Sequence, residues 1–436
     1  MSKNKVRLSQ CMIVKDEEKN IQRALAWAKP VAFEQIVVDT GSTDKTVELA
    51  EAMGAKVYHF EWIKDFSAAK NYAIEQATGD WIAFLDADEY LSPEDTKKLT
   101  KKLETLENNS NTQKSINVIN MPWVHLNDNG EAMGINTQTR LFRNIKEIRY
   151  IGRIHEQISV YGKITEVNDI SIMHTGYSET EHKEKGKSQR NIDLLRIELE
   201  KNPDDITKKA YLADSLQSKN ILDNYSNEEE TTETDALFME VIETNEYIPE
   251  FLKKKAYMHH IGRSWEITEK REFRDSLCKK AYETFPDDLD IGYYYSIVLN
   301  NNKEYAKAWD LLKRMESQLK TGTGHISGAS ARIQSNLTMI FGQLLTAAQG
   351  LGDLENTINY ATVMLASDKT QQNILSPYIR TLLQNGISEE EVLGLLSKIY
   401  DISSPNDLLL IARCAKDGGS IEFARMIMTI AGELMG

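Results

Sequence analysis

The chain has 436 residues, which is more than one hydrophobic core usually holds, so we expect two domains. Lys and Arg total 52 and Asp and Glu total 66, which gives a net charge of −14. An acidic surface argues against non-specific binding to nucleic acid or to an anionic membrane, although it allows a local basic pocket for one phosphate ligand.

The first residues, MSKNKVRLSQCMIVKDEEKN, contain no apolar run long enough for a signal peptide, and no later run approaches the roughly 20 apolar residues of a membrane span. Cys11, Cys278 and Cys414 lie far apart and fit neither a disulfide framework nor a zinc site. We therefore expect a cytoplasmic protein whose cysteines are buried structural thiols.

Residues 6 to about 180 alternate short β-rich runs with helical patterns. The predicted strands are 8–14, 34–40, 55–62 and 80–88. The predicted helices are 18–30, 42–54, with Ser42 as N-cap and Gly54 at its end, and 65–79. This alternation predicts an α/β domain with a mostly parallel, doubly wound sheet. Ligands of such sheets lie outside the carboxyl ends of the strands, so the residues that follow each strand are the first candidates for a site.

From about residue 186 the β-branched runs disappear, and helical patterns continue to the C-terminus. The motif KNPDD at 201–205 returns loosely as TFPDD at 284–288, which suggests stacked helix pairs of the tetratricopeptide (TPR) type. The polar stretch 224–235 is predicted to be a loop between repeats, and 320–330 is predicted to be either another loop or a seam between sub-domains.

The change of pattern predicts two domains, α/β in residues 1–185 and all-α and TPR-like in residues 186–436. Concave surfaces of helical repeats suit extended peptides, so the second domain is expected to bind a peptide or protein. The aromatic cluster GYYYSIV at 292–298 fits a peptide groove as well as a helical core. The last helices are apolar enough for a homodimer contact, and ordinary capping of the repeat is the alternative.

The stretch GDWIAFLDADEYL ends an apolar run with Asp86 and Asp88. If the strand continues through them, both side chains project to one side and can share a divalent cation. Mg²⁺ and Mn²⁺ prefer such oxygen ligands. The alternative is a solvated strand end that leads into a helix, with Ser92 as N-cap and Pro93 at its first position.

Asp39 ends another predicted strand and is followed by the turn TGSTDKT. A carboxylate there can accept hydrogen bonds from a nucleobase or a ribose, or it can belong to a helix-capping turn. Lys70, in the helical stretch SAAKNYA, could face a phosphate or be a surface lysine.

Four stretches in this order, MIVKDEEKNI, IVVDTGSTDKT, DFSAAKNYAIEQATGDWIAFLDADE and RLFRN…GRIHEQI, resemble family 2 glycosyltransferases of the nucleotide-diphospho-sugar fold, known as GT-A. The resemblance covers roughly residues 6–185. It implies an inverting enzyme that moves a hexose or N-acetylhexosamine from a nucleotide-sugar donor, above all a UDP-sugar, with Mg²⁺ or Mn²⁺ as cofactor. Joined to a helical second half, the domain is similar to transferases that glycosylate bacteriocin precursor peptides.

The resemblance also implies a donor site at the ends of the first strands. The residues that it assigns to the nucleotide-sugar are Lys15, Glu17, Asp39, Ser42, Lys70, Asp86 and Arg140. Among these, the loop of Lys15 and Asp39 would hold uridine, and Lys70 would lie near the diphosphate. Arg140, like Arg143, fits a phosphate or acceptor contact as well as a structural ion pair.

Asp86-Ala87-Asp88 matches the DxD motif of the family, in which the second Asp usually binds the metal and the first contacts the ribose or metal-bound water. His174, in SIMHTGYS, matches a histidine that completes the metal site in many relatives, and it also fits a core histidine. The implied metal ligands are therefore Asp86, Asp88 and His174. The segment GYSETEHKEKGKSQ that follows would close over the donor.

An inverting transferase needs a group that takes the proton of the acceptor. Glu156, in GRIHEQI, occupies the position of this base in the family, and an exposed strand carboxylate is its other interpretation. Many relatives carry a Glu-Asp pair where this chain has His155 and Glu156, so His155 is the alternative base.

The acceptor remains open between a Ser, Thr or Cys side chain of a peptide and a cell-envelope saccharide. Phosphatases that form an aspartyl-phosphate also use DxD at a strand end, but Tyr90 does not fit their pattern. A non-catalytic peptide-binding scaffold is the remaining alternative, and the presence of both Asp86 and Asp88 argues against it.

Overall fold

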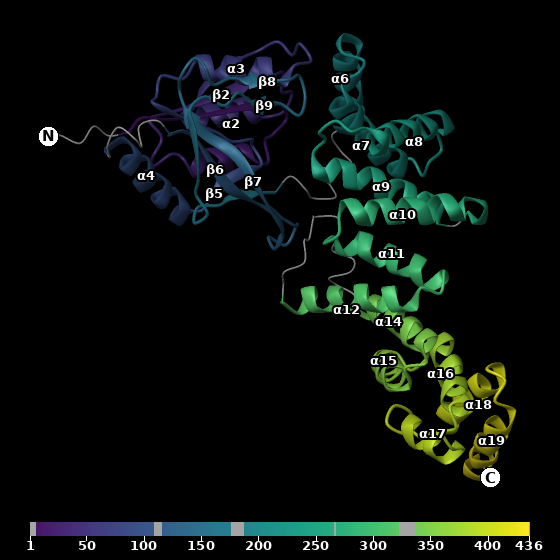
Figure 1. Ribbon diagram of the computed structural model, residues 1–436. Coiled ribbons are helices and arrows are strands. Elements are labelled where there is room, and N and C mark those ends of the chain that lie inside the picture. The colour runs from purple at the N-terminus through teal and green to yellow at the C-terminus, as the bar shows by residue number, and fades with distance from the viewer. Residues whose placement is uncertain (1–5, 109–115, 176–186, 266, 322–336, 436) are drawn as a thin grey trace. The chain divides into compact units, whose positions relative to one another are not determined.

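The computed structural model describes residues 6–108, 116–175, 187–265, 267–321 and 337–435 (Figure 1). The chain divides into two compact units, Met1–Leu252 and Lys253–Gly436. The described strands all belong to the first unit, together with the helices up to the start of α9, and the second unit is built of helices.

A mixed, mostly parallel β-sheet organises the first unit. Its described strands are β1 (Leu8–Val14), β2 (Glu34–Asp39), β3 (Lys56–His59), β4 (Trp81–Phe84), β5 (Glu89–Leu91), β6 (Ile116–Leu126), β7 (Ala132–Arg143), β10 (Lys163–Glu166) and β11 (Ile172–His174). Their order is β3-β2-β1-β4-β7-β6-β11-β5, with β10 paired to β6. Because β1, β2, β3 and β4 run parallel, their carboxyl ends meet at one edge. β7 is antiparallel to both β4 and β6.

Helices cover both faces of this sheet (Figure 1). They are α1 (Ile21–Ala26), α2 (Thr46–Ala52), α3 (Phe66–Glu75) and α4 (Pro93–Asn108). Neighbouring residues of β1 point to opposite sides, since Cys11 packs in a cluster with Ile74 of α3, whereas Met12 packs in another with Leu25 of α1. The predicted class, an α/β domain around a mostly parallel sheet followed by an all-α region, is confirmed.

The fourth strand is shorter than predicted. β4 ends at Phe84, and the Glu89 N–H donates to the Asp86 carbonyl at 3.0 Å, so the chain turns at residues 86–89. The argument that Asp86 and Asp88 project to one side of an extended strand is therefore wrong, because alternation holds for extended backbone and not for a turn.

The helix starts test two predicted caps. Ser42 is not the N-cap of α2, because that helix begins at Thr46, whose N–H donates to Asp44 Oδ1 at 2.9 Å. Ser92 is confirmed as the cap of α4, since its Oγ accepts the Asp95 N–H at 3.0 Å with Pro93 as the first helical residue.

After the sheet, the described part of the chain continues with helices. The first are α6 (Lys187–Lys201), α7 (Ile206–Leu222), α8 (Glu228–Glu243) and α9 (Glu250–Ser264). The predicted loop at 224–235 is wrong over most of its length, because α8 begins at Glu228. Asn227 caps this helix by accepting the Glu230 N–H at 3.2 Å, and the acidic residues of the first turn suit a helix N-terminus.

The change from strands to helices lies between His174, the last residue of β11, and Lys187, the first of α6. The predicted domain boundary at 185/186 falls in this interval, whereas the compact units divide at 252/253. The first helices thus belong to the compact unit of the sheet, and the functional boundary stays a prediction.

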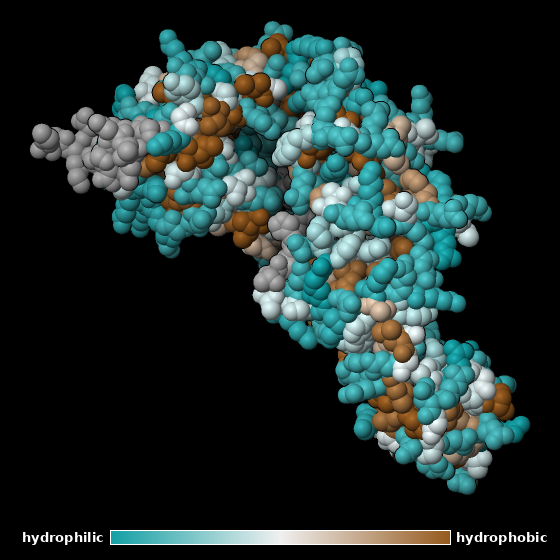
Figure 2. Space-filling view, viewed as in Figure 1, coloured by the Kyte–Doolittle hydropathy of each residue, from teal (hydrophilic) through white to brown (hydrophobic). Residues whose placement is uncertain are grey.

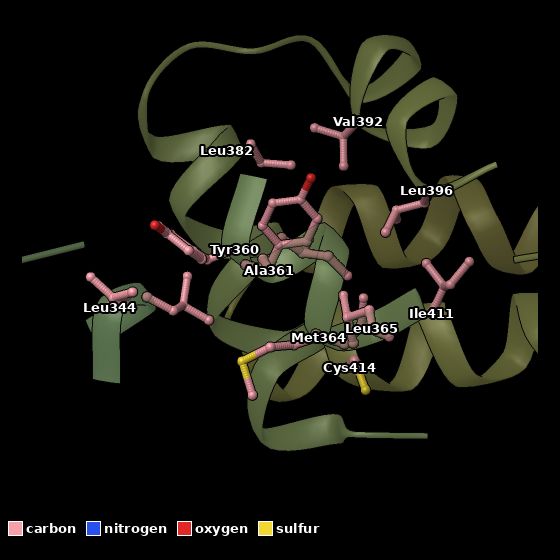
Figure 3. Close-up of a cluster of buried hydrophobic side chains, with 14 of the residues drawn as sticks. Leu344, Tyr360, Ala361, Met364, Leu365, Leu382, Val392, Leu396, Ile411 and Cys414 are labelled. Carbon is pink, nitrogen blue, oxygen red and sulfur yellow. The ribbon is translucent and has the colours of Figure 1, made fainter. Parts of the chain in front are cut away.

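The second unit packs its helices around a continuous apolar core. They are α9 from Lys253 on, η1 (Thr268–Lys270), α10 (Arg271–Thr284), α11 (Leu289–Asn301), α12 (Tyr305–Thr321), α14 (Leu337–Leu351), α15 (Leu354–Ser367), α16 (Gln372–Gln384), α17 (Glu389–Leu396), α18 (Pro405–Asp417) and α19 (Ile421–Met435). Figure 3 shows Tyr360, Leu382, Leu396 and Cys414 within this core. The predicted loop at 320–330 begins inside α12, and its residues from 322 on lie outside the described part.

Hydrophilic side chains cover most of the face seen in Figure 2. Within the described ranges, every helix is either too short or too polar to cross a lipid bilayer. Cys11, Cys278 and Cys414 are buried free thiols, as predicted.

Candidate active site

Two loops at the carboxyl ends of β1 and β2 are bound to each other. Asp16, at φ 54°, accepts the Thr43 N–H with its Oδ1 at 2.7 Å and donates its own N–H to Ser42 Oγ at 3.0 Å. Lys15, whose side chain is exposed, and the half-buried Glu17 flank Asp16. The structure thus brings three of the residues predicted to bind the nucleotide-sugar, Lys15, Glu17 and Ser42, into adjoining loops.

Asp39, the last residue of β2, is buried beside these loops. Its carboxylate accepts the N–H groups of Gly41 at 3.2 Å and Ser42 at 3.0 Å, and His59 Nδ1 lies at 3.4 Å. Burial raises the pKa of Asp39, but the hydrogen bonds from Ser42 and Gly41 outweigh burial and lower it. Asp39 therefore lies in a turn, but this turn does not cap α2, which begins at Thr46, and the contact of Asp39 with a nucleoside stays a prediction.

Asp86 lies between two cations. Its Oδ2 is 2.9 Å from Arg140 Nη2, and its Oδ1 is 3.3 Å from Lys70 Nζ. Arg140 Nη2 also lies 2.7 Å from Oε1 of the fully buried Glu89. Burial alone would raise the pKa of Asp86, but Lys70 and Arg140 lower it to about 2. Arg140 thus makes structural ion pairs, one of its two predicted interpretations.

Lys70 of α3 is an interior residue, so its interpretation as a surface lysine is wrong. Its side chain is 4% exposed, and Nζ lies 2.8 Å from Glu156 Oε1. Nζ is also 5.2 Å from the ring centre of Phe84 and 5.0 Å from that of Tyr150. Burial lowers the pKa of Lys70, but the carboxylates of Asp86 and Glu156 outweigh burial and raise it, so Lys70 is charged.

Asp88 faces a histidine pair. The Nε2 atom of His174, the last residue of β11, is 3.4 Å from Asp88 Oδ2. The Nδ1 atom of His174 is 3.2 Å from Nδ1 of His125 on β6. Sequence reasoning missed His125, because its nearness to His174 follows from the β6–β11 register, which places the two residues opposite each other. Burial and the neighbouring His174 lower the pKa of His125, which favours a neutral ring.

Asp88 and His174 fit a divalent cation as two ligands that face each other. Within the described ranges, no three His, Cys, Asp or Glu side chains are grouped closely enough to hold a metal by themselves. Magnesium-type ions commonly take few protein ligands and complete their shell with water and substrate phosphates. The geometry therefore suits a metal that binds together with a phosphate-bearing ligand. Because Asp86 is turned towards Lys70 and Arg140, its direct role as a ligand stays a prediction.

Both candidate bases lie in the loop between β8 (Tyr150–Ile151) and β9 (Gln157–Ile158). Glu156 is partly buried and ion-paired to Lys70, so it is not an exposed strand carboxylate. His155, at φ 50°, stacks on the ring of Tyr211 in α7, with the ring centres 3.7 Å apart and the planes at 11°.

The remaining predictions for the site concern Arg143 and the segment 176–189. Arg143 binds Glu107 at 2.7 Å and the Ile116 carbonyl at 3.0 Å, so it is a structural residue at the far end of β7. Of the segment 176–189, predicted to close over a donor, residues 176–186 lie outside the described part, and the rest begins α6.

Comparison with known proteins bears out the resemblance. Residues 9–153 match the sequence profile of Glycosyl transferase family 2. A TPR repeat-containing protein of Synechococcus elongatus is 36% identical over 222 residues, which are 48% of this chain and 51% of that protein. The SPbeta prophage-derived glycosyltransferase SunS of Bacillus subtilis is 33% identical over 203 residues, which are 44% of this chain and 46% of that protein.

Among solved structures, S. aureus TarS is similar with 17% sequence identity and a TM-score of 0.35, over 62% of this chain and 55% of that chain. The chain spans about half the length of the curated relatives it matches, as the shares of 51% and 46% show.

Proposed function

From the match of residues 9–153 to Glycosyl transferase family 2, we propose that this chain is an inverting, metal-dependent glycosyltransferase. It moves a hexose or N-acetylhexosamine from a nucleotide-sugar, a UDP-sugar in the first place, to a Ser, Thr or Cys side chain of a peptide or protein. One observation supports this most. At the carboxyl ends of the parallel strands, Asp88 faces His174 while Lys70 links Asp86 to Glu156.

In this proposal the adjoining loops after β1 and β2 receive the nucleoside. Asp39 accepts hydrogen bonds from the ribose or the base in addition to those of its turn, and Lys15, Glu17 and Ser42 line the same place. Asp88 and His174 would hold Mg²⁺ or Mn²⁺, which supplies neutralisation of the negative charge on the departing diphosphate.

Glu156 is the base in the proposed reaction. The acceptor oxygen or sulfur forms a bond to the anomeric carbon, and the bond from that carbon to the diphosphate oxygen breaks. The proton of the acceptor goes to the Glu156 carboxylate, and the electron pair of the broken bond leaves with the nucleoside diphosphate. Lys70 orients Glu156 through their contact at 2.8 Å. His155 is engaged in the stack with Tyr211, which favours Glu156 over it as the base.

The choice of a polypeptide acceptor is supported by the helical second unit. A hollow of about 450 Å³ in this unit is lined by Tyr293, Gln343, Met364 and Asn373, among others. Side chains that combine an aromatic ring, a thioether and amides suit an extended peptide, whose backbone needs hydrogen-bond partners at intervals. The similarity to SunS points to the same class of transferase, and a bacteriocin-type precursor is the first candidate.

Hydrolysis of UDP-sugars in the presence of Mn²⁺ tests the donor half of the proposal. We expect release of UDP that requires the metal, and a loss of about 10²-fold or more in Asp88→Asn, because that change removes one of the two facing ligands. Asp128→Asn, in an exposed turn, is the matched control and should keep the wild-type rate. Equal rates in both variants would contradict the proposal.

Mass spectrometry of candidate peptides incubated with the enzyme and a panel of nucleotide-sugars tests the acceptor half. We expect a mass increase of one or more hexose or N-acetylhexosamine units on a Ser, Thr or Cys side chain. Transfer to a cell-envelope saccharide with no transfer to any peptide would show that the acceptor class is wrong while the donor chemistry holds.

A further inference from the structure

The loop that carries Glu156 has an unusual backbone. Gly152 lies at φ +96° and His155 at φ +50°, so the loop enters the left-handed region twice within four residues. Glycine adopts this conformation readily, but a histidine there is held by its surroundings. The question is which contacts keep His155 in this conformation.

Helix α3 supports the loop from the side of the sheet. The Phe66 N–H donates to the Arg153 carbonyl at 2.9 Å, and Ser67 Oγ donates to the Gly152 carbonyl at 2.5 Å. One helical turn on, Lys70 binds Glu156. These contacts fix Gly152 and Arg153 at one end of the loop and Glu156 at the other. The residues between them, Ile154 and His155, contact other elements.

Helices α6 and α7 hold the middle. The Ile154 side chain is buried in one apolar cluster with residues of both helices, including Leu195 and Leu212. Lys208 Nζ donates to the Ile154 carbonyl at 3.1 Å, and the Tyr211 ring lies flat against His155. Lys208 and Tyr211 are spaced by three residues, so they lie on one face of α7 and reach the loop together.

We propose that Tyr211 is a positioning residue of the active site. Its ring stacks on His155 and keeps that residue in its left-handed conformation. The next residue, Glu156, is thereby held in position to contact Lys70 and to take the proton of the acceptor. Helices α6 and α7 then help to fix the geometry of the active site. This inference rests on the proposed function, because it assigns Glu156 the role of the base.

The test compares Tyr211→Phe with Tyr211→Leu. The phenyl ring keeps the stack, so Tyr211→Phe should retain the wild-type kcat within about twofold. Tyr211→Leu should lower kcat roughly 10- to 100-fold, with little change in the KM of the donor. Tyr378→Leu removes a ring that is more deeply buried than that of Tyr211, from the core of the second unit, and should leave kcat for donor hydrolysis unchanged.

Amide hydrogen exchange of residues 150–158 is the second readout. It should speed up about 10-fold in Tyr211→Leu and stay at the wild-type rate in Tyr211→Phe and Tyr378→Leu. If Tyr211→Leu fails to fold, Lys208→Met removes the bond to the Ile154 carbonyl alone and should raise exchange of the same residues.

The possible failures are separable. Wild-type protein without any transfer or donor hydrolysis would overturn the proposed function, while the exchange rates would still report on the loop. Unchanged exchange and unchanged kcat in Tyr211→Leu would overturn the positioning role. An equal loss in Tyr211→Phe would also overturn it, because it would assign the effect to the hydroxyl and not to the stacked ring.

Discussion

At the scale of single residues, Lys70 is a buried cation that two carboxylates of the candidate site share. It is enclosed at 4% exposure, and both Asp86 and Glu156 depend on its charge. Arg140 compensates Asp86 from the other side, whereas Glu156 is ion-paired to Lys70. Replacing Lys70 therefore leaves a partly buried carboxylate without its cation.

We predict that Lys70→Met lowers the free energy of unfolding by about 3 kcal/mol, because one partner of a buried ion pair is lost while the other remains. Urea denaturation measures this change. The exposed Lys146→Met is the control and should stay within about 0.5 kcal/mol of wild type. Adding Glu156→Gln to Lys70→Met should recover part of the loss. A single variant as stable as wild type would contradict the ion-pair argument.

The sequence anticipates some of these residues and misses others for definite reasons. The motif around His174 predicts a partner for Asp88, and the two side chains are 3.4 Å apart. The burial of Lys70 is not predictable from SAAKNYA, because the carboxylates that compensate its charge come from residues 86 and 156. The place of His125 in the site is not predictable from its local sequence either, because the β6–β11 register is what puts it opposite His174.

At the scale of elements, Glu34 joins the start of β2 to its neighbours. Its Oε1 accepts Ser9 Oγ of β1 at 2.8 Å and the Thr78 N–H ahead of β4 at 2.6 Å, and its Oε2 binds Lys56 Nζ of β3 at 2.7 Å. Burial raises the pKa of Glu34, but Lys56 and the hydrogen bonds from Thr78 and Ser9 outweigh burial and lower it to about 2.

This carboxylate makes stability depend on pH in a definite direction. The pKa in the folded state, about 2, lies below the ordinary value of 4.5, so the contribution of Glu34 is complete above pH 4.5 and is lost as the pH falls from there towards 2. We predict that Glu34→Gln lowers the free energy of unfolding by about 1–3 kcal/mol at pH 7, and that its difference from wild type shrinks below pH 4.5.

Thermal unfolding at a series of pH values between 3 and 7 checks this dependence. The exposed Glu75→Gln, on α3, serves as the control and should show no such trend. A difference between Glu34→Gln and wild type that stays constant down to pH 3 would count against the pKa argument.

Elements with a strong period are predictable in this chain, and those without one are not. The buried run IVV correctly predicts strand β2. The helical spacing of apolar residues correctly predicts helices at the places of α1, α2 and α3. β7 has no apolar period, since its first half is largely exposed, and its place is set by antiparallel pairing with β6. The acidic start of α8 resembles a loop in composition, and Asn227 makes it a helix by capping it.

At the scale of the whole molecule, the extent of the catalytic unit is open to a direct test. The cluster around Ile154 contains residues of the loop, of α6 and of α7, so a fragment that ends at residue 185 loses part of its own core. We predict that residues 1–252 unfold cooperatively and retain UDP-sugar hydrolysis with Mn²⁺, whereas residues 1–185 do neither. Calorimetry and the hydrolysis assay compare the two fragments, and equal behaviour would show that α6 and α7 are dispensable.

The interior position of the cysteines makes the chain well suited to site-specific labelling. Burial raises the pKa of Cys11, Cys278 and Cys414, so none of them offers a reactive thiolate to an electrophilic dye. A cysteine placed by Asp128→Cys in an exposed turn would then take up a maleimide fluorophore selectively. The native thiols can therefore be left in place during labelling.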